Sequence, residues 1–165
     1  MKTFLISDTH FGHANILTFK KNDGTFLREF KDVQDMNEYM VYKWNSTVSS
    51  GDKVYLLGDV SMGSDLSIID RLNGTKVLIK GNHDTLKLNK YMERFKDVRA
   101  YHILDKFILS HIPIHPESLS RWKANIHGHT HANSLEDKRY YNVCVENINY
   151  TPVDFEEIRN AYNQL

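Results

Sequence analysis

Three short runs of apolar, β-prone residues in the first half of the chain each end directly in a polar motif. The runs cover residues 4–6, 54–57 and 77–79. The motifs that follow them are Asp8-Thr9-His10, Gly58-Asp59-Val60 and Gly81-Asn82-His83-Asp84. Short apolar runs bounded by turn residues are typical of buried strands. Because the polar motifs stand where strands end, we expect them to converge on one rim of the fold.

Two histidine motifs in the second half complete a set of metal-binding residue types. They are His111 and Gly128-His129-Thr130-His131. Carboxylate and amide oxygens together with imidazole nitrogens suit borderline divalent cations. Seven candidate donors exceed the four that usually close a structural zinc site. Two cations roughly 3.5–4 Å apart fit the set better, and Asp59, in its middle, is the natural bridging carboxylate.

Each motif taken alone has an ordinary explanation. An Asp-x-His pair after a strand is more often a cap or a loop pair, and Gly-Asp is common turn chemistry. Gly81-Asn82-His83-Asp84 fits a turn with Asn82 in the left-handed region. Only the occurrence of all five motifs in this order indicates a metal centre. We interpret His102 as structural, and His127 falls outside the pattern.

In this order the motifs resemble those of the calcineurin-like metallophosphoesterase superfamily. Residues 11–16 are also similar to small bacterial and phage members. The resemblance implies that Asp8, His10, Asp59 and His131 bind one metal, and that Asp59, Asn82, His111 and His129 bind a second. It also implies that His83 is a catalytic residue and not a ligand. Manganese is the metal the resemblance favours, although this donor set also suits Fe, Ni, Co or Zn.

The resemblance implies a metal-dependent phosphoester hydrolase in which a metal-bridging hydroxide attacks phosphorus. His83 would stabilise the transition state or protonate the leaving group, and either Asp84 or Asp65 could orient it. The chain has no large insertion that could form a cap. We therefore expect an open site that favours phosphodiesters, such as a nucleotide-like substrate or a nucleic-acid end.

Substrate contacts and rival functions stay open at this point. His13, Arg28 and Arg121 are candidate substrate contacts, since a guanidinium matches phosphate geometry. A phosphomonoesterase or nucleotidase could use the same centre. A non-catalytic protein-binding scaffold with this fold, or a protein that binds one metal, are rivals from other classes.

Composition limits where such a protein acts. The length of 165 residues predicts one domain, residues 1–165. Lys plus Arg and Asp plus Glu number 21 each, so no field of the whole protein draws nucleic acid or membrane. Cys144, the single cysteine, lies between valines and predicts a buried strand thiol. The apolar start is too short for a signal peptide, and no stretch is long enough to cross a membrane, so we expect the cytoplasm.

The order of predicted elements indicates an α/β fold. Strands are expected at 2–6, 53–57, 77–79, 98–104, 106–110, 124–126 and 139–146, and helices at 32–47, 64–72 and 86–95. A last helix should start with Thr151 as cap and Pro152 in its first turn. The first half alternates strand and helix, while the second is mostly strand, which predicts two mixed sheets flanked by helices. The resemblance implies a four-layer α/β/β/α sandwich with two metals at the carboxyl ends of the strands.

Overall fold

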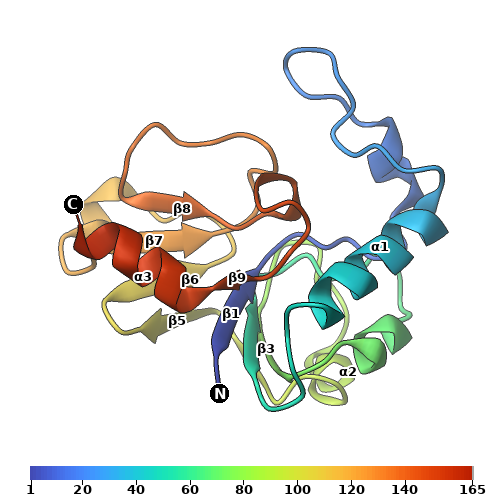
Figure 1. Cartoon of the computed structure of the whole chain (residues 1–165), viewed down its shortest axis with the longest axis horizontal. Helices are drawn as coiled ribbons and strands as arrows, with labels where there is room; N and C mark the ends of the chain where they lie inside the picture. The colour runs from blue at the N-terminus through green and yellow to red at the C-terminus, as the bar shows by residue number, and fades with distance from the viewer. Residues whose placement is uncertain (165) are drawn as a thin grey trace.

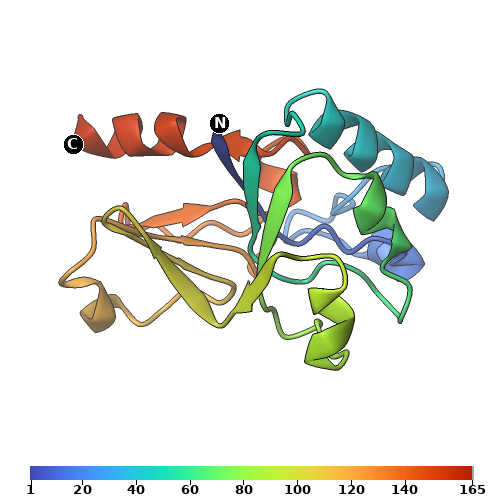
Figure 2. The same cartoon turned by 90° about the horizontal axis from the view of Figure 1, so that it is seen from below.

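The computed structural model of the protein describes residues 1–164 and contains two mixed β-sheets and three α-helices (Figures 1 and 2). The first sheet contains β1 (Thr3–Ile6), β2 (Lys53–Leu56), β3 (Thr75–Ile79), β4 (Asp97–Arg99) and β9 (Val153–Asp154). Its order is β4-β3-β2-β1-β9. β1 to β4 run parallel, and β9 pairs antiparallel with β1.

Helical segments connect the parallel strands of the first sheet. The connections hold the 3-10 helix η1 (Ala14–Thr18) and α1 (Val33–Asn45) after β1, η2 (Ser67–Arg71) after β2, and α2 (Leu88–Met92) after β3. Successive side chains of a strand point to opposite faces. Phe4 and Ile6 accordingly join a core that includes α1, whereas Leu5 joins the core between the two sheets. The first sheet is therefore buried on both faces.

The second sheet packs its apolar face against the first. It contains β5 (Tyr101–Leu104), β6 (Phe107–Ser110), β7 (Ala124–His127) and β8 (Tyr140–Asn142), in that order. β5 pairs antiparallel with β6, and β6, β7 and β8 are parallel. Leu109 and Ile126 share a core with Leu5 and Ile79 of the first sheet. Phe155 from α3 (Phe155–Asn163) joins the same core.

Two mixed sheets with helices confirm the expected α/β class, whereas the four-layer arrangement stays a prediction. The outer face of the second sheet carries Asn125 and Tyr140, which bond to a loop. The Ile114 amide donates to Asn125 Oδ1 at 3.0 Å, and the Tyr140 hydroxyl donates to the Ile114 carbonyl at 2.6 Å. The same loop holds η3 (Pro116–Leu119), which buries Leu119.

Helix α1 confirms the pattern-based prediction closely. Asp32 caps it by accepting the Asp35 amide at 2.8 Å. Met36, Met40 and Trp44 are all buried, as the three- and four-residue spacing predicts. At 13 residues α1 is far below the length of about 20 that a bilayer requires. Among residues 1–164, no helix has the length and apolar character to cross a membrane.

Several predicted boundaries are wrong. The predicted strand 98–104 is broken at Ala100 into β4 and β5, which belong to different sheets. The predicted strand 139–146 stops at Asn142, and η4 (Val145–Asn147) follows. In both segments the apolar pattern runs on past the residue at which the chain leaves one strand, so the pattern alone does not locate the end of that strand.

Three predicted helices also differ. Residues 64–72 form only η2, and 86–95 form only the five-residue α2. The last helix starts at Phe155 with Asp154 as its cap, which accepts the Glu156 amide at 3.1 Å. Residues 153–154 are instead the edge strand β9, so pairing with β1 replaces the expected first helical turn at Pro152.

We expect Trp44→Ala to lower the free energy of unfolding of the metal-free protein by about 3–5 kcal/mol. Trp44 is 1% exposed, and its indole donates to the Asn73 carbonyl at 3.0 Å, so truncation leaves a cavity and an unpaired carbonyl. Tyr42→Ala on the exposed face of α1 is the matched control, with a change of about 0.5 kcal/mol or less. Urea unfolding measures both. Equal losses in the two variants would contradict this assignment of the core.

Candidate metal centre

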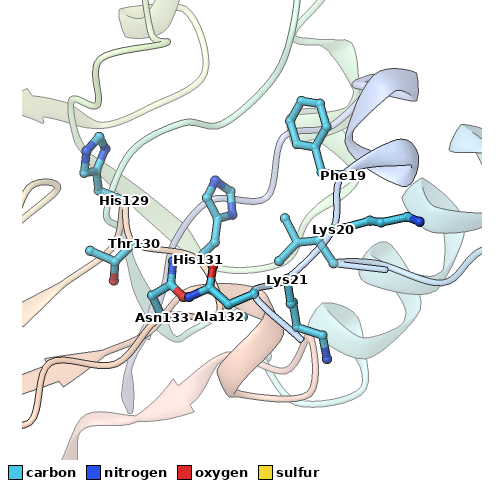
Figure 3. A pocket seen from close by; sticks show the side chains of 10 residues that line it. Phe19, Lys20, Lys21, His129, Thr130, His131, Ala132 and Asn133 are labelled. Carbon is cyan, nitrogen blue, oxygen red and sulfur yellow. The ribbon is translucent and has the colours of Figure 1, made fainter. Parts of the chain in front are cut away.

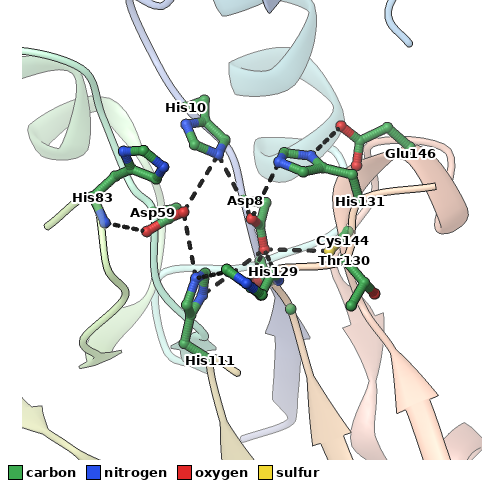
Figure 4. Close-up of polar contacts among 12 residues, drawn as sticks. Asp8, His10, Asp59, His83, His111, His129, Thr130, His131, Cys144 and Glu146 are labelled. Carbon is green, nitrogen blue, oxygen red and sulfur yellow. Dashed lines mark hydrogen bonds and ion pairs between the residues drawn. The ribbon is translucent and has the colours of Figure 1, made fainter. Parts of the chain in front are cut away.

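The polar motifs do converge at the carboxyl ends of strands from both sheets (Figure 4). Asp8 and His10 follow β1, Asp59 follows β2, Asn82 follows β3, His111 follows β6, and His129 and His131 follow β7. The sheets meet here, because the Ser7 amide donates to the Val143 carbonyl at 2.9 Å and the Val145 amide to the Ser7 carbonyl at 3.1 Å. The junction of the sheets therefore brings together motifs that are far apart in the sequence.

These side chains form two groups that could each hold a metal ion. Asp8, His10 and His131 make one group, and Asp59, His111 and His129 make the other, with ligand atoms in each within 4.8 Å of one another. In the first group, Asp8 Oδ1 lies 3.6 Å from His10 Nε2 and 3.8 Å from His131 Nε2. In the second, His111 Nε2 lies 3.3 Å from Asp59 Oδ2.

Asn82 adds an amide oxygen to the second group. Its Oδ1 lies 2.8 Å from His111 Nε2 and 3.0 Å from His129 Nδ1. The two imidazole nitrogens are themselves 3.3 Å apart. Four side chains, each from the end of a different strand, thus point toward one another. They are Asp59, Asn82, His111 and His129.

Asp59 lies between the two groups. Its Oδ2 is 3.3 Å from His111 Nε2 and 3.6 Å from His10 Nε2. Its other oxygen accepts the His83 amide at 2.8 Å. The carboxylate is therefore fixed from one side while its other oxygen faces a histidine of each group.

Three buried polar atoms of the first group lack a protein hydrogen-bond partner within the described residues. They are Asp8 Oδ1 and both ring nitrogens of His10. Leaving a buried carboxylate oxygen unpaired is costly, and such atoms need an explanation. A cation supplies one for Asp8 Oδ1 and His10 Nε2, which lie 3.6 Å apart in the group that also contains His131. The donors present, oxygen and imidazole without thiolate, fit a divalent metal.

The backbone is strained at most of these donors. Asp8, His10, Asp59, His129 and His131 have φ values of 58°, 47°, 53°, 70° and 49°. Left-handed conformations are uncommon for residues other than glycine and cost of the order of 1–3 kcal/mol each when they are sparsely populated. They cluster where surrounding structure holds a functional geometry. Here the strained turns aim the side chains inward directly after the strands end.

Two glycines allow the motif loops to approach each other. A Cβ atom at Gly81 would collide with the Asp59 side chain, and one at Gly128 would collide with Ser7 and Asp8. The glycines of these motifs are therefore required for space. Any side chain at either position would push the carboxylates out of place.

Hydrogen bonds orient two of the histidines toward the centre. His111 Nδ1 donates to the Leu57 carbonyl at 2.7 Å, and His131 Nδ1 donates to Glu146 Oε1 at 3.0 Å. An acceptor on Nδ1 fixes the tautomer and leaves Nε2 as the basic nitrogen. In both rings this Nε2 faces a carboxylate of the centre.

Arg28 is buried and bonded to the protein itself, whereas the sequence suggested that it contacts the substrate. It is 1% exposed, and it donates to Glu146 Oε1 at 2.8 Å from both Nε and Nη2. It also donates to the carbonyls of Thr9 at 2.9 Å and Asp8 at 2.5 Å. Arg28 and Glu146 therefore support His131 and the loop of Asp8. Sequence reasoning missed Glu146 because it lies in no motif and is 118 residues from Arg28.

The other two candidate substrate contacts lie in different places. His13 stands next to the centre, with its ring 5.5 Å from that of His10. Burial lowers the pKa of His13. Arg121 is exposed ahead of β7, at the opposite end of that strand from His129, so the structure does not bring it to the centre.

His83 lies at the exposed edge of the centre, with its ring 5.6 Å from that of His10. Neither carboxylate considered as its orienting group is used in that way. Asp84 is buried and accepts the amides of Asp59, Val60 and Gly81 at 2.9, 3.0 and 2.7 Å. Asp65 accepts the Ser67 amide at 2.8 Å. Asp84 instead ties the loop after β2 to the loop after β3.

The two central carboxylates are ionised at neutral pH. Burial alone raises the pKa of Asp8, but the nearby His10 ring and the charges of protonated His111 and His131 outweigh burial and hold this pKa below its ordinary value in the metal-free protein. Burial also raises the pKa of Asp59, but the hydrogen bond and charge of protonated His111, together with the hydrogen bond from the His83 amide, outweigh burial and lower this pKa in the metal-free protein. Cys144 is buried as predicted, and burial raises the pKa of its thiol, which donates to Asp8 Oδ2 at 3.3 Å.

A cavity of about 600 Å³ adjoins the centre (Figure 3). His129, His131 and Asn133 line one side, and Phe19, Lys21 and Leu27 line the other. The centre is thus open to a small molecule on the side of His129 and His131.

Comparison with known proteins gives one relative that covers almost the whole chain and others that cover about half of it. No family model matches the sequence. A protein of Methanocaldococcus jannaschii described as uncharacterized protein MJ1445 is 37% identical over 95% of this chain and 89% of its own length. The gene 66 protein of Mycobacterium phage L5 is 34% identical to this chain in the matched region. That region covers 50% of this chain and 39% of the phage protein.

Two solved structures share the fold. The crystal structure of the protein of unknown function AQ665 from Aquifex aeolicus has a TM-score of 0.78 and 26% identity, covering 97% of this chain and 98% of that one. Pseudomonas putida nuclease MPE has a TM-score of 0.52 and 22% identity, covering 78% of this chain and 61% of that one. The nuclease is similar in fold alone. The identity and coverage of the archaeal relative show that the chain belongs to the family of the Methanocaldococcus jannaschii protein MJ1445.

Proposed function

We propose that the protein is a metal-dependent phosphoester hydrolase of the calcineurin-like metallophosphoesterase superfamily, with a two-metal centre that acts on phosphodiesters. The observation that carries the proposal is the position of Asp59, whose Oδ2 faces a histidine of each donor group. A single bridging carboxylate between two complete donor sets is what a two-metal hydrolase requires. The nuclease with a similar fold supports the same reaction class.

Each donor set can be assigned to one cation. The first cation would be held by Asp8, His10, Asp59 and His131, and the second by Asp59, Asn82, His111 and His129. When bound, two divalent cations lower the pKa of water and neutralise the charge of phosphate oxygens. The protein contributes ionised carboxylates, oriented imidazoles and loops fixed by Asp84 and Arg28. Manganese is the metal we propose.

His83 is the proposed acid of this centre. Its backbone amide is bonded to Asp59 Oδ1, so its position is tied to that of the central carboxylate. Its ring stands at the exposed edge beside His10, where a leaving group would depart. From there, a protonated His83 can donate a proton to the leaving oxygen or stabilise negative charge on the phosphoryl group.

An open site favours a phosphodiester over a monoester. The cavity beside His129 and His131 offers room for a group on one side of the phosphate, and the exposed edge at His83 leaves room on the other. A monoester needs only one of these spaces. The complete donor sets and the retained His83 also argue against a non-catalytic scaffold.

The metal count tests the centre directly. We expect metal-stripped protein to take up two Mn²⁺ per chain, and Asp59→Asn to lose both, because the bridging charge is shared. Asp70→Asn, at an exposed carboxylate, is the control and should keep both ions. Equilibrium dialysis with elemental analysis gives the count. One tightly held Mn²⁺ in the wild type, or two in Asp59→Asn, would contradict the two-metal assignment.

Glu146 is expected to support the first cation through His131. Glu146→Ala should weaken the affinity of that site for Mn²⁺ by about 10- to 100-fold, which is typical when the orienting partner of a ligating histidine is removed. Glu146→Gln, which keeps an acceptor for His131 Nδ1, should have an affinity for Mn²⁺ between those of the wild type and Glu146→Ala. Calorimetric titration measures both, with circular dichroism to check folding. Glu157→Gln, an exposed carboxylate on α3, should bind as the wild type does. Unchanged affinity in a folded Glu146→Ala protein would refute this role.

Hydrolysis of bis-p-nitrophenyl phosphate and of p-nitrophenyl phosphate by the Mn²⁺-loaded protein tests the reaction class. We expect faster turnover of the diester, and a loss of about 10²- to 10⁴-fold in kcat for His83→Asn, which should still bind two ions. His115→Asn, an exposed histidine outside the centre, is the control. Full activity of a metal-loaded His83→Asn protein would contradict the assignment of His83 as the acid. Turnover of the monoester alone would overturn the diester preference.

A further inference from the structure

An arm formed by residues 19–27 projects from the body of the protein next to the metal centre (Figures 1 and 3). It is built as a small hairpin. The Lys21 amide donates to the Thr25 carbonyl and the Leu27 amide to the Phe19 carbonyl, both at 2.8 Å, and Gly24 turns the chain with a φ of 83°. The arm therefore has a defined conformation although most of its side chains are exposed.

The base of the arm is fastened to the loop that carries Asp8. Arg28 directly follows the arm, and its buried guanidinium donates to the carbonyls of Asp8 and Thr9. Glu146 holds the same guanidinium and also His131. The arm and the first donor group are thus held by one set of hydrogen bonds, which fixes the distance between them.

The cavity of about 600 Å³ lies between this arm and the loop of His129 and His131 (Figure 3). Its volume falls within the range of roughly 300–1,000 Å³ that is usual for small-molecule sites. Phe19 and Leu27 give its wall on the arm an apolar surface. Asn22 and Asn133 add amide groups that can both donate and accept hydrogen bonds.

Phe19 is the side chain that links the cavity to the centre. It is 45% exposed, although it is large and apolar. Its ring meets that of His13 edge to face, with centroids 5.6 Å apart, and His13 lies 5.5 Å from His10. Only the ring of His13 therefore lies between the exposed ring of Phe19 and His10, a candidate ligand of the first group. Phe26, on the same arm, faces a different hollow that Arg28 and Phe30 line.

We propose that this cavity binds the nucleoside part of a phosphodiester substrate, with its base stacked on Phe19 while the phosphate lies at the metal centre. The inference rests on the proposed function and names its substrate class. Every base has a face that can stack on an aromatic ring, and amides can bond to its edge. Lys20 and Lys21 also line the cavity and bring positive charge to it, which favours a ligand with phosphate groups.

Two esters with the same leaving group test this inference. One is the p-nitrophenyl ester of thymidine 5′-monophosphate, and the other is methyl p-nitrophenyl phosphate, which has no nucleoside. The Mn²⁺-loaded protein should prefer the nucleotide ester in kcat/KM. Phe19→Ala should reduce this preference by roughly 5- to 150-fold, chiefly through KM, as expected for the loss of one stacked base. Phe19→Trp should keep the preference, and Phe26→Ala should match the wild type.

Direct binding separates the nucleoside site from the reaction. Thymidine 5′-monophosphate is titrated into the same Mn²⁺-loaded proteins by calorimetry, and Phe19→Ala should bind it roughly 5- to 150-fold more weakly. If neither ester is hydrolysed, the proposed function fails, and this titration still decides the nucleoside site. If Phe19→Ala and Phe26→Ala bind thymidine 5′-monophosphate as the wild type does, the nucleoside site is overturned, whatever the hydrolysis shows.

Discussion

The convergence of two buried carboxylates and four imidazoles at the junction of the sheets is the constraint on which the rest of the structure depends. Asp8 and Asp59 both lie at this junction and are almost fully buried. Two ionised groups in such a place are costly unless positive charge and hydrogen bonds surround them. His10 and His111 face the carboxylates, and the loops turn through left-handed conformations to achieve this geometry. This geometry costs backbone strain, which Asp8, His10, Asp59, His129 and His131 bear.

A second, buried set of polar groups keeps that geometry in place. Asp84 accepts three backbone amides from the loops after β2 and β3, so it fixes Asp59 without facing the centre. On the other side, Arg28 and Glu146 join the loop of Asp8, the ring of His131 and the base of the arm. These groups show how a centre made of loops can be rigid: the loops after β1, β2 and β3 and the ring of His131 are each held by a buried charged side chain.

The sequence pattern predicted secondary structure correctly where a whole element packs against the same surroundings. The spacing of Met36, Met40 and Trp44 and the cap at Asp32 predicted α1 almost to the residue. The pattern failed where the chain changes its strand partner within one apolar-patterned segment. Residues 98–104 look like one strand, yet Ala100 separates β4 of the first sheet from β5 of the second. Near Pro152, pairing with β1 displaced the start of α3 to Phe155.

The sequence by itself determined the kinds of donor, their order and their position at strand ends, because these depend on residue type and on short-range periodicity. Only the tertiary structure decided that Asp59 lies between the two groups, that Arg28 is a buried support and that Glu146 orients His131. It also decided that the arm around Phe19 closes one side of a cavity. Such relations join residues that are tens to more than a hundred positions apart, and they follow from how the two sheets meet, which no local pattern records.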